Sequence, residues 1–253
     1  MKYYDELIRL EVFSKEEINR LTGNPNSAKT FLRSAVNNGQ AEKIRHNYYA
    51  VKSLETGKAI PSRFVIGSGI NESAYLSHHT AFEYYGMANQ VFETVYVSST
   101  SKFRDFSHDG IEYKHLISKI DFGVVTPTKH VKVTDIERTI LDNIKDFLKI
   151  GGLEELLRCL SMVTVVDETV LLKYLAAYDN QFLYQKTGYM LSHFKNIRLS
   201  DAFFNKCAEN IGDSIRYLYD GIQYESPQYN TKWQVFAPVD LMKLIEKGGD
   251  AIA

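Results

Sequence analysis

Cysteine is scarce in this chain, which has two among its 253 residues, Cys159 and Cys207, and no C-x-x-C spacing. A disulfide framework or a zinc module built from closely spaced cysteines needs more of them. Each cysteine stands in an apolar helical pattern. We therefore expect two buried free thiols in a reducing compartment, not a disulfide or a zinc site.

Long apolar runs are missing as well. No uninterrupted stretch approaches the length that spans a membrane. The N-terminal segment Met1–Glu6 is charged and lacks the apolar core of a signal peptide. The protein is therefore expected to be cytoplasmic and to have no membrane partner.

The sequence patterns of several enzyme classes are also absent. The chain has no phosphate-binding GxxxxGK[ST] loop, no GxGxxG, no GxSxG nucleophile elbow and no HExxH. It has neither an internal repeat nor a low-complexity segment, which disfavours solenoid and disordered classes. We therefore expect no catalytic residue, no cofactor and no bound metal.

What is present describes a globular protein with an uneven charge distribution. Hydrophobic residues make up 44% and charged residues 24%, and the length suggests two or three domains. The net charge is −1, but residues 1–52 contain nine Lys or Arg and six acids, which leaves them at +3 and the remainder at −4. A basic excess confined to the first module fits contact with nucleic acid there.

Two helices joined by a turn are predicted between Ser14 and Asn37. Ser14 and Glu17 have capping-box spacing, and Thr22–Gly23 ends the first helix. From Asn26 onward a face at helical spacing is expected to pack inward, composed of Ala28, Phe31, Leu32, Ala35 and Val36. The opposite face carries side chains that can contact phosphates and base edges, so we interpret this helix as a recognition helix.

A hairpin follows, with strands over residues 41–45 and 48–51 and a tip at His46–Asn47. With Ile44 in the core, Lys43 and Arg45 are expected to share the outer face and reach a phosphate backbone. Together the elements predict a winged helix-turn-helix. The predicted DNA-binding residues are Asn26, Ser27, Lys29, Thr30, Arg33, Asn37, Lys43, Arg45, His46 and Asn47. The alternative is a small α+β module whose basic residues are merely solvated.

The overall class predicted is α+β in three parts: a winged helix-turn-helix domain over 1–52, a linker over 53–61, and a region over 62–253. Within that region, 62–147 reads as mixed α/β and 148–253 as mainly helical. Ser77 is expected to cap a helix closed by Gly86, and strands are expected over 92–98, 102–106, 110–116 and 123–133. A capping box from Thr134 to Glu137 opens a further helix. Four later helices and a late extended piece, 230–236, follow.

Two polar groups could carry chemistry. His79 and Glu83 lie four residues apart beside His78, but a third metal ligand at a telling distance is missing, so local packing is the preferred interpretation. The alternative hypothesis is a metal-dependent nuclease with Asp135, Glu137 and His79 as ligands, although carboxylates in a first helical turn also stabilise the helix dipole. Arg138 and Asp142 have the spacing of a surface ion pair.

A cluster of late aromatic residues is expected to form core and cover for the last strand, with a partner-binding patch as the alternative: Tyr217, Tyr219, Tyr224, Tyr229 and Trp233.

Three stretches give the chain a resemblance to the AbiEi family of antitoxins, which are encoded with nucleotidyltransferase toxins in bacterial abortive-infection, type IV toxin-antitoxin systems. Glu42–Val51 is similar to the wing of that family. Ser77–Met87 looks like its S-x-x-[ST]-A-L-x-x-x-G-L helix, and Val133–Asp142 resembles its V-x-D-x-E-R-T-L-L-D signature. At the wing tip the family often has Arg-Gly, whereas this chain has His46–Asn47, so the turn is retained and a cation is lost.

The resemblance implies a repressor of its own operon whose N-terminal module binds repeated sequences in double-stranded promoter DNA. It also implies that the C-terminal region counteracts the toxin without a stable complex. A third hypothesis is a transcription factor for other genes with a ligand-sensing C-terminal region. A nucleotidyltransferase gene directly downstream would favour the antitoxin over the sensor.

Overall fold

The computed structural model describes residues 3–246. Met1 and Lys2, which open the charged N-terminal segment, and residues 247–253, which end the expected C-terminal region, lie outside the described residues. The fold is α+β with several sheets, as predicted. Its described residues form two compact units: 3–76, 92–118 and 124–133 make up the first, and 77–91, 119–123 and 134–246 make up the second.

The two units differ from the domains expected from sequence. Residues 1–52 share their unit with strands of the middle region, and the expected 62–147 part is divided between both units. The chain passes between the units several times. Because each unit is assembled from separate stretches of the chain, no single linker in the sequence marks the boundary between them.

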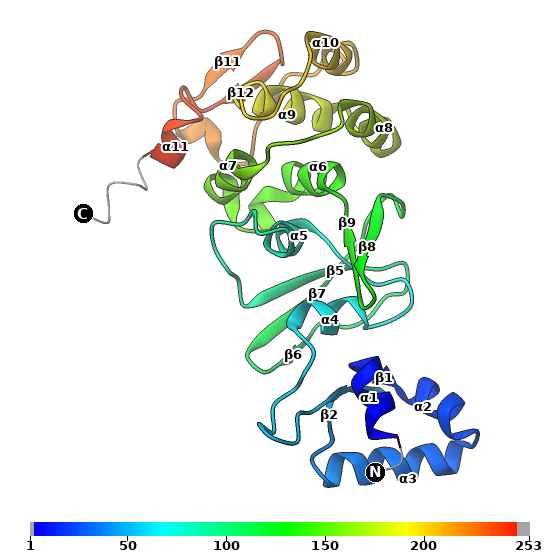
Figure 1. Cartoon of the computed structure of the whole chain (residues 1–253). Coiled ribbons are helices and arrows are strands. Elements are labelled where there is room, and N and C mark those ends of the chain that lie inside the picture. The colour runs from blue at the N-terminus through cyan, green and yellow to red at the C-terminus, as the bar shows by residue number, and fades with distance from the viewer. Residues whose placement is uncertain (1–2, 247–253) are drawn as a thin grey trace. The chain divides into compact units, whose positions relative to one another are not determined.

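The N-terminal part of the first unit contains three helices and a small sheet (Figure 1). The order is α1 (Tyr4–Leu10), β1 (Val12–Ser14), α2 (Lys15–Thr22), α3 (Pro25–Asn37), β2 (Ala41–Arg45) and β3 (Tyr48–Val51). The strands are antiparallel in the order β1-β3-β2. Strand β1 was not predicted, because three residues are too few to show a strand period. The core consists of Leu7, Phe13, Ile18, Ala28, Leu32, Ala35, Ala41 and Val51.

The residues expected to form a linker make a tight turn instead. The backbone amide of Ser53 donates to the carbonyl of Lys58 at 2.9 Å, and Lys52 and Ala59 form an antiparallel bridge. The turn residues thus satisfy their own backbone groups locally, although their sequence has no period.

A six-stranded mixed sheet occupies the rest of the first unit, in the order β6-β7-β5-β4-β9-β8. Its elements are α4 (Arg63–Ser68), which packs against β4 and β5, then β4 (Tyr75–Leu76), β5 (Thr94–Ser98), β6 (Phe106–His108), β7 (Ile111–Leu116), β8 (Val124–Thr128) and β9 (Val131–Thr134). The expected strand over 123–133 is a hairpin of two strands. The expected strand over 102–106 is wrong, since β6 begins only at Phe106.

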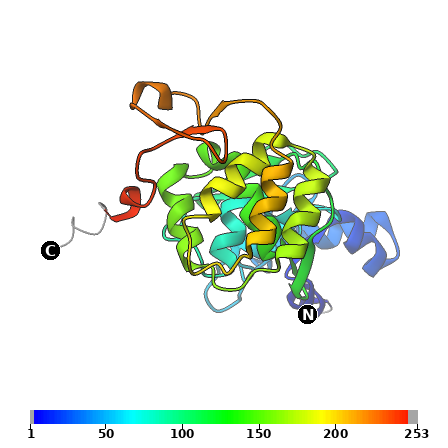
Figure 2. The ribbon, with the colours of Figure 1, turned by 90° about the horizontal axis from the view of Figure 1, so that it is seen from above.

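The second unit is mainly helical. It contains α5 (His78–Tyr84), α6 (Ile136–Asp146), the 3-10 turn η1 (Phe147–Lys149), α7 (Gly152–Met162), α8 (Glu168–Tyr178), α9 (Gln181–Leu191) and α10 (Asp201–Glu209). A three-stranded sheet of β10 (Arg216–Tyr217), β12 (Val235–Ala237) and β11 (Gln228–Asn230) follows, with η2 (Ile222–Tyr224) and α11 (Lys243–Glu246). Figure 2 shows the yellow and orange helices α9 and α10 side by side, and α6 packs on α5, α8 and α9.

Trp233 lies in the turn between β11 and β12, not inside the single extended piece expected there, and is only 2% exposed. Gly188 of α9 faces it, where an added Cβ would stand 2.1 Å from the indole ring. The late tyrosines were expected to form core and cover for the last strand; Tyr224 is 86% exposed, so the expectation is wrong for it, whereas Tyr217 and Tyr229 are partly exposed and cover β12. Tyr217 and Tyr229 flank Phe236 on one sheet face.

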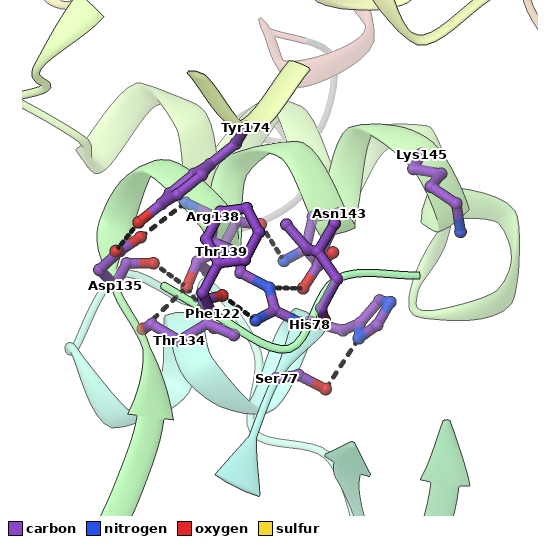
Figure 3. Close-up of polar contacts among 12 residues, drawn as sticks. Ser77, His78, Phe122, Thr134, Asp135, Arg138, Thr139, Asn143, Lys145 and Tyr174 are labelled. Atoms are coloured by element: carbon purple, nitrogen blue, oxygen red, sulfur yellow. Dashed lines mark hydrogen bonds and ion pairs between the residues drawn. The ribbon is translucent and has the colours of Figure 1, made fainter. Parts of the chain in front are cut away.

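The start of α6 is capped by Asp135, and the capping box predicted from Thr134 to Glu137 is wrong (Figure 3). The Asp135 carboxylate accepts the Arg138 amide at 2.9 Å and the Tyr174 hydroxyl at 2.5 Å. The hydroxyl of Thr134 pairs with that of Thr139, and Glu137 accepts the Asp167 amide. Asp is as good an N-cap as Thr, and its position here is fixed by Tyr174, a contact that local spacing cannot show.

Arg138 and Asp142 are buried, so their predicted surface position is wrong. Arg138 is 0% exposed, its Nε lies 3.5 Å from Asp142 Oδ2, and its guanidinium also donates to the carbonyls of Ile120 and Phe122. Tyr178 donates to the other Asp142 oxygen. Arg138 therefore fastens segment 119–123 to α6 within this unit.

Ser77 occupies the N-cap position of α5, but its side chain makes no capping hydrogen bond, contrary to expectation. Its hydroxyl pairs instead with His78 Nδ1 at 2.9 Å (Figure 3). Gly86 closes the segment with φ +69°, as a C-terminal glycine should.

We predict that the second unit becomes more stable as the pH rises from 7 to about 9.5, because Lys186 loses its proton in the folded chain before it does in the unfolded chain. Burial against Phe147 and Phe182 lowers the pKa of Lys186 to about 8. Between that value and its ordinary pKa the unfolded chain holds a proton that the folded chain has released, so the free energy of unfolding increases with pH. After allowance for partial solvent screening, the gain is on the order of 1 kcal/mol.

Urea unfolding of the wild type and of Lys186→Met at pH 7 and 9.5 measures this effect. The wild type should gain stability over that interval relative to the variant. Equal pH dependence in the two proteins would show that Lys186 is not the cause.

Candidate nucleic-acid interface

The capping box predicted at the start of α2 is confirmed. The Glu17 amide donates to Ser14 Oγ at 3.1 Å, and the Ser14 amide donates to Glu17 Oε2 at 2.7 Å. The cap places Lys15 in the first turn of α2. There its amide donates to the carbonyl of Asn47 at 3.3 Å, so the helix start lies against the tip of the β2–β3 hairpin.

Helix α3 begins one residue earlier than expected, at Pro25, with Asn24 as its N-cap. Asn24 Oδ1 accepts the amides of Asn26 and Ser27, and proline at the first helical position loses no hydrogen bond. The expected outer face is exposed. On the expected inner face Ala28, Leu32 and Ala35 are buried, but Val36 is 37% exposed, so its predicted burial is wrong.

A β-bulge separates Lys43 from Arg45. Lys43 pairs with Tyr49 and Arg45 pairs with Tyr48, which leaves Ile44 as the extra residue. A bulge shifts the alternation of side chains by one. Lys43 and Arg45 therefore lie on opposite faces of the hairpin, and the prediction that they share one face is wrong.

Arg45 lies on the face of the hairpin opposite Lys43, where its guanidinium packs against two aromatic rings. Its guanidinium carbon lies 5.2 Å from the ring centre of Phe106 and 5.7 Å from that of Phe103, both in the same unit. On this face Glu42 also pairs with His108 at 3.0 Å, and the Tyr48 hydroxyl donates to the carbonyl of Ile66 at 2.7 Å. Burial raises the pKa of Tyr48, so its hydroxyl remains a donor. This face of the hairpin anchors it to the larger sheet.

The face of the hairpin that carries Lys43 and Tyr49 forms, together with α3, a groove of about 440 Å³. Its lining residues are Lys15, Lys29, Leu32, Arg33, Val36, Asn37, Lys43, Asn47 and Tyr49. Four of these carry a positive charge, and none of the described residues that line the groove is acidic. Amides of Asn37 and Asn47 and the apolar side chains of Leu32, Val36 and Tyr49 complete it. Fixed cations with apolar and amide neighbours suit a polyanion that has both phosphates and base edges.

The structure brings together five of the ten predicted residues: Lys29, Arg33, Asn37, Lys43 and Asn47. Asn26, Ser27 and Thr30 are exposed on the first turns of α3, and His46 is exposed at the hairpin tip, but none of them lines the groove. Asn47 has φ +58°, so it takes the left-handed conformation that the two-residue tip requires.

Sequence reasoning missed Lys15 and Tyr49 as members of this surface. Lys15 follows a recognisable N-cap, but nothing in its spacing shows that the start of α2 lies beside the hairpin. Tyr49 has the pattern of an ordinary strand residue.

The three ligands of the hypothetical nuclease do not form one group. His79 lies between Glu83 and Glu155, at 2.9 Å from each, whereas Asp135 caps α6 and Glu137 binds the Asp167 amide. The carboxylates expected as metal ligands are thus occupied by helix and loop amides.

Comparisons with known proteins give a fold relationship. No protein-family model matches the chain, and no curated protein matches it. Among solved structures, the RV2827C protein from Mycobacterium tuberculosis is similar over 94% of this chain and 90% of its own, with a TM-score of 0.66 and 12% sequence identity. At 12% identity this similarity shows a shared fold and gives no information about function. None of the described helices combines the length and apolar character needed to cross a bilayer.

Proposed function

We propose that this chain is a DNA-binding autoregulator with antitoxin activity, and that α2, α3 and the β2–β3 hairpin act as a winged helix-turn-helix. In this proposal α3 is the recognition helix and the hairpin is the wing. The observation that carries it is the groove, in which cations from α2, α3 and the hairpin converge and whose described lining residues include no acid. Convergence from three elements is harder to explain by solvated surface charge alone.

The roles of the groove residues follow from where they lie. Lys29 and Arg33 project from consecutive turns of α3 and would approach base edges and phosphates in the major groove. Lys43 and Lys15 flank them from the hairpin and from α2 and would bind the phosphate backbone. Arg45, one of the predicted contacts, serves the hairpin as an anchor in this proposal and does not reach DNA.

The antitoxin part of the proposal rests on the sequence resemblance to the AbiEi family. Glu42–Val51, which resembles the family's wing, forms the hairpin side of the groove. Ser77–Met87 and, from Thr134 onward, Val133–Asp142, the other two stretches, have buried residues in the second unit and so would maintain its structure. The opposed partner would be a nucleotidyltransferase toxin, without a stable complex.

Lys43→Ala is expected to weaken binding to the chain's own promoter fragment and to random DNA by the same factor. Removing one phosphate contact should also reduce the slope of log affinity against log salt concentration by about 0.9. Fluorescence anisotropy over a series of salt concentrations with both DNA duplexes measures the two quantities.

Lys58→Ala is the matched control, because Lys58 is an exposed lysine of the same unit that does not line the groove. It should leave affinity and slope unchanged. If Lys43→Ala and Lys58→Ala behave alike, the groove is not the DNA-binding surface.

A further inference from the structure

A buried cluster in the second unit combines three side chains that ligate metals. His79 and Glu83 lie on α5, and Glu155 and Cys159 lie one turn apart on α7. The ligand atoms of His79, Glu155 and Cys159 all lie within 4.8 Å of one another, and all three residues are buried. This supplies the further ligands that the spacing of His79 and Glu83 lacked in the sequence.

The ligand atoms of the cluster lie close enough together to share one small cation. His79 Nε2 lies 2.9 Å and Cys159 Sγ lies 3.5 Å from Glu155 Oε1. Ligands around a tetrahedral zinc ion, bound at about 2.0–2.3 Å, are separated from one another by roughly 3.3–3.8 Å. The Sγ–Oε1 distance falls within that range, whereas Nε2 and Oε1 would have to move apart by roughly 0.4–0.9 Å to admit the ion.

Glu83 holds the imidazole in the orientation that a metal-binding histidine needs. Its carboxylate lies 2.9 Å from His79 Nδ1, and both side chains are 2% exposed. A carboxylate on one ring nitrogen fixes the tautomer and directs the other nitrogen, here Nε2, to the ion. Glu83 is therefore a positioning residue.

Only one oxygen of the Glu155 carboxylate accepts hydrogen bonds from the described residues. Oε1 accepts the amides of Asn89 and Gln90 at 3.1 and 3.2 Å, whereas Oε2 is buried without a hydrogen-bond partner among the described residues. Buried carboxylate oxygens in proteins are ordinarily paired or bound to a metal.

We propose that His79, Glu155 and Cys159 bind one structural Zn²⁺ that joins α5 to α7. An imidazole, a carboxylate and a thiolate are a donor set that zinc accepts, and the fourth position falls to Glu155 Oε2 or to water. Binding releases the Cys159 thiol proton to solvent, because the thiolate is the ligand. The site is independent of the proposed DNA-binding function and lies in the other unit.

Metal analysis of the purified full-length chain, expressed with zinc in the medium, tests the proposal. We expect about one zinc per chain after dialysis, and a Co²⁺-substituted form with a thiolate-to-cobalt charge-transfer band in the near ultraviolet. Cys159→Ser should abolish that band and lower zinc affinity by more than about 100-fold, and Glu83→Gln should lower it about 10- to 100-fold.

Cys207→Ser is the control, because Cys207 is also a buried free thiol but lies outside the cluster. It should keep the band and the affinity. Wild-type protein that holds no zinc and gives no thiolate band with Co²⁺ would overturn the proposal without any variant, as would equal zinc affinities of Cys159→Ser and Cys207→Ser. Should Cys159→Ser not fold, Glu83→Gln still decides the matter, since a site without metal predicts no change in zinc affinity.

Discussion

Arg138→Met is expected to lower the free energy of unfolding by about 3–5 kcal/mol, the largest effect predicted for this chain. The substitution removes the guanidinium that pairs with Asp142 and that satisfies the carbonyls of Ile120 and Phe122. Asp142, which is 2% exposed, would then lack its counter-ion and keep the hydrogen bond from the Tyr178 hydroxyl. Leaving a buried charge without its counter-ion costs more than the pair itself contributes.

Urea unfolding monitored by the fluorescence of Trp233, the chain's only tryptophan, measures the loss within the unit concerned. Arg158→Met is the matched control, because Arg158 pairs with Glu154 on the outside of α7, and should change stability by less than about 1 kcal/mol. The double variant Arg138→Met, Asp142→Leu should recover part of the loss. A loss below about 1 kcal/mol in the single variant would mean that the pair is solvated and not buried.

Arg33→Ala is expected to lower affinity for the operator by about 1–3 kcal/mol, which is roughly a 5- to 150-fold weaker complex. Arg33 projects from α3 into the groove, where an arginine can bind one base edge through two hydrogen bonds. Unlike Lys43→Ala, this variant should lose more affinity for the operator than for random DNA, because a base contact carries sequence information and a phosphate contact does not.

Competition of operator and random duplexes for the same labelled fragment gives the specificity ratio directly. Arg20→Ala provides the control, since Arg20 is an exposed arginine of α2 that lines a different surface cavity. An unchanged ratio for Arg33→Ala would show that α3 does not read the sequence.

The same variant separates the two halves of the proposed function in cells. With the downstream toxin gene on a second plasmid, Arg33→Ala should release a promoter reporter from repression and still rescue growth. Loss of both would mean that antitoxicity depends on repression, and loss of rescue alone would contradict the assignment of the groove to DNA.

Much of the first unit could be predicted because its signals are local. The capping box at Ser14, the periodicity of α3 and the turn at Asn47 each depend on residues within four or five positions, and each is present. Hydrogen bonds to nearby amides and the fixed 3.6-residue period produce these features in almost any tertiary context.

The errors arose where a distant contact overrides a local preference. Thr134 has good cap spacing, but Asp135 caps α6 because Tyr174, 39 residues away, binds the same carboxylate. Arg45 was expected beside Lys43, but a one-residue bulge turns it toward Phe103 and Phe106. Arg138 and Asp142 have the spacing of a surface pair and are buried by segments that spacing does not reveal.

The sequence by itself determined the α+β class, the exposed polar face of α3 and the basic excess of its first 52 residues, because periodicity and charge are properties of the chain before it folds. Only the tertiary structure decided which cations share a surface. It places Lys15 of α2 beside Lys43 of the hairpin and removes Arg45 from that surface. It also brings Glu155 and Cys159 to His79 across 76 residues or more. Residues so far apart in the chain become neighbours only because particular apolar faces pack together, and the spacing of residues in the sequence does not show which faces those are.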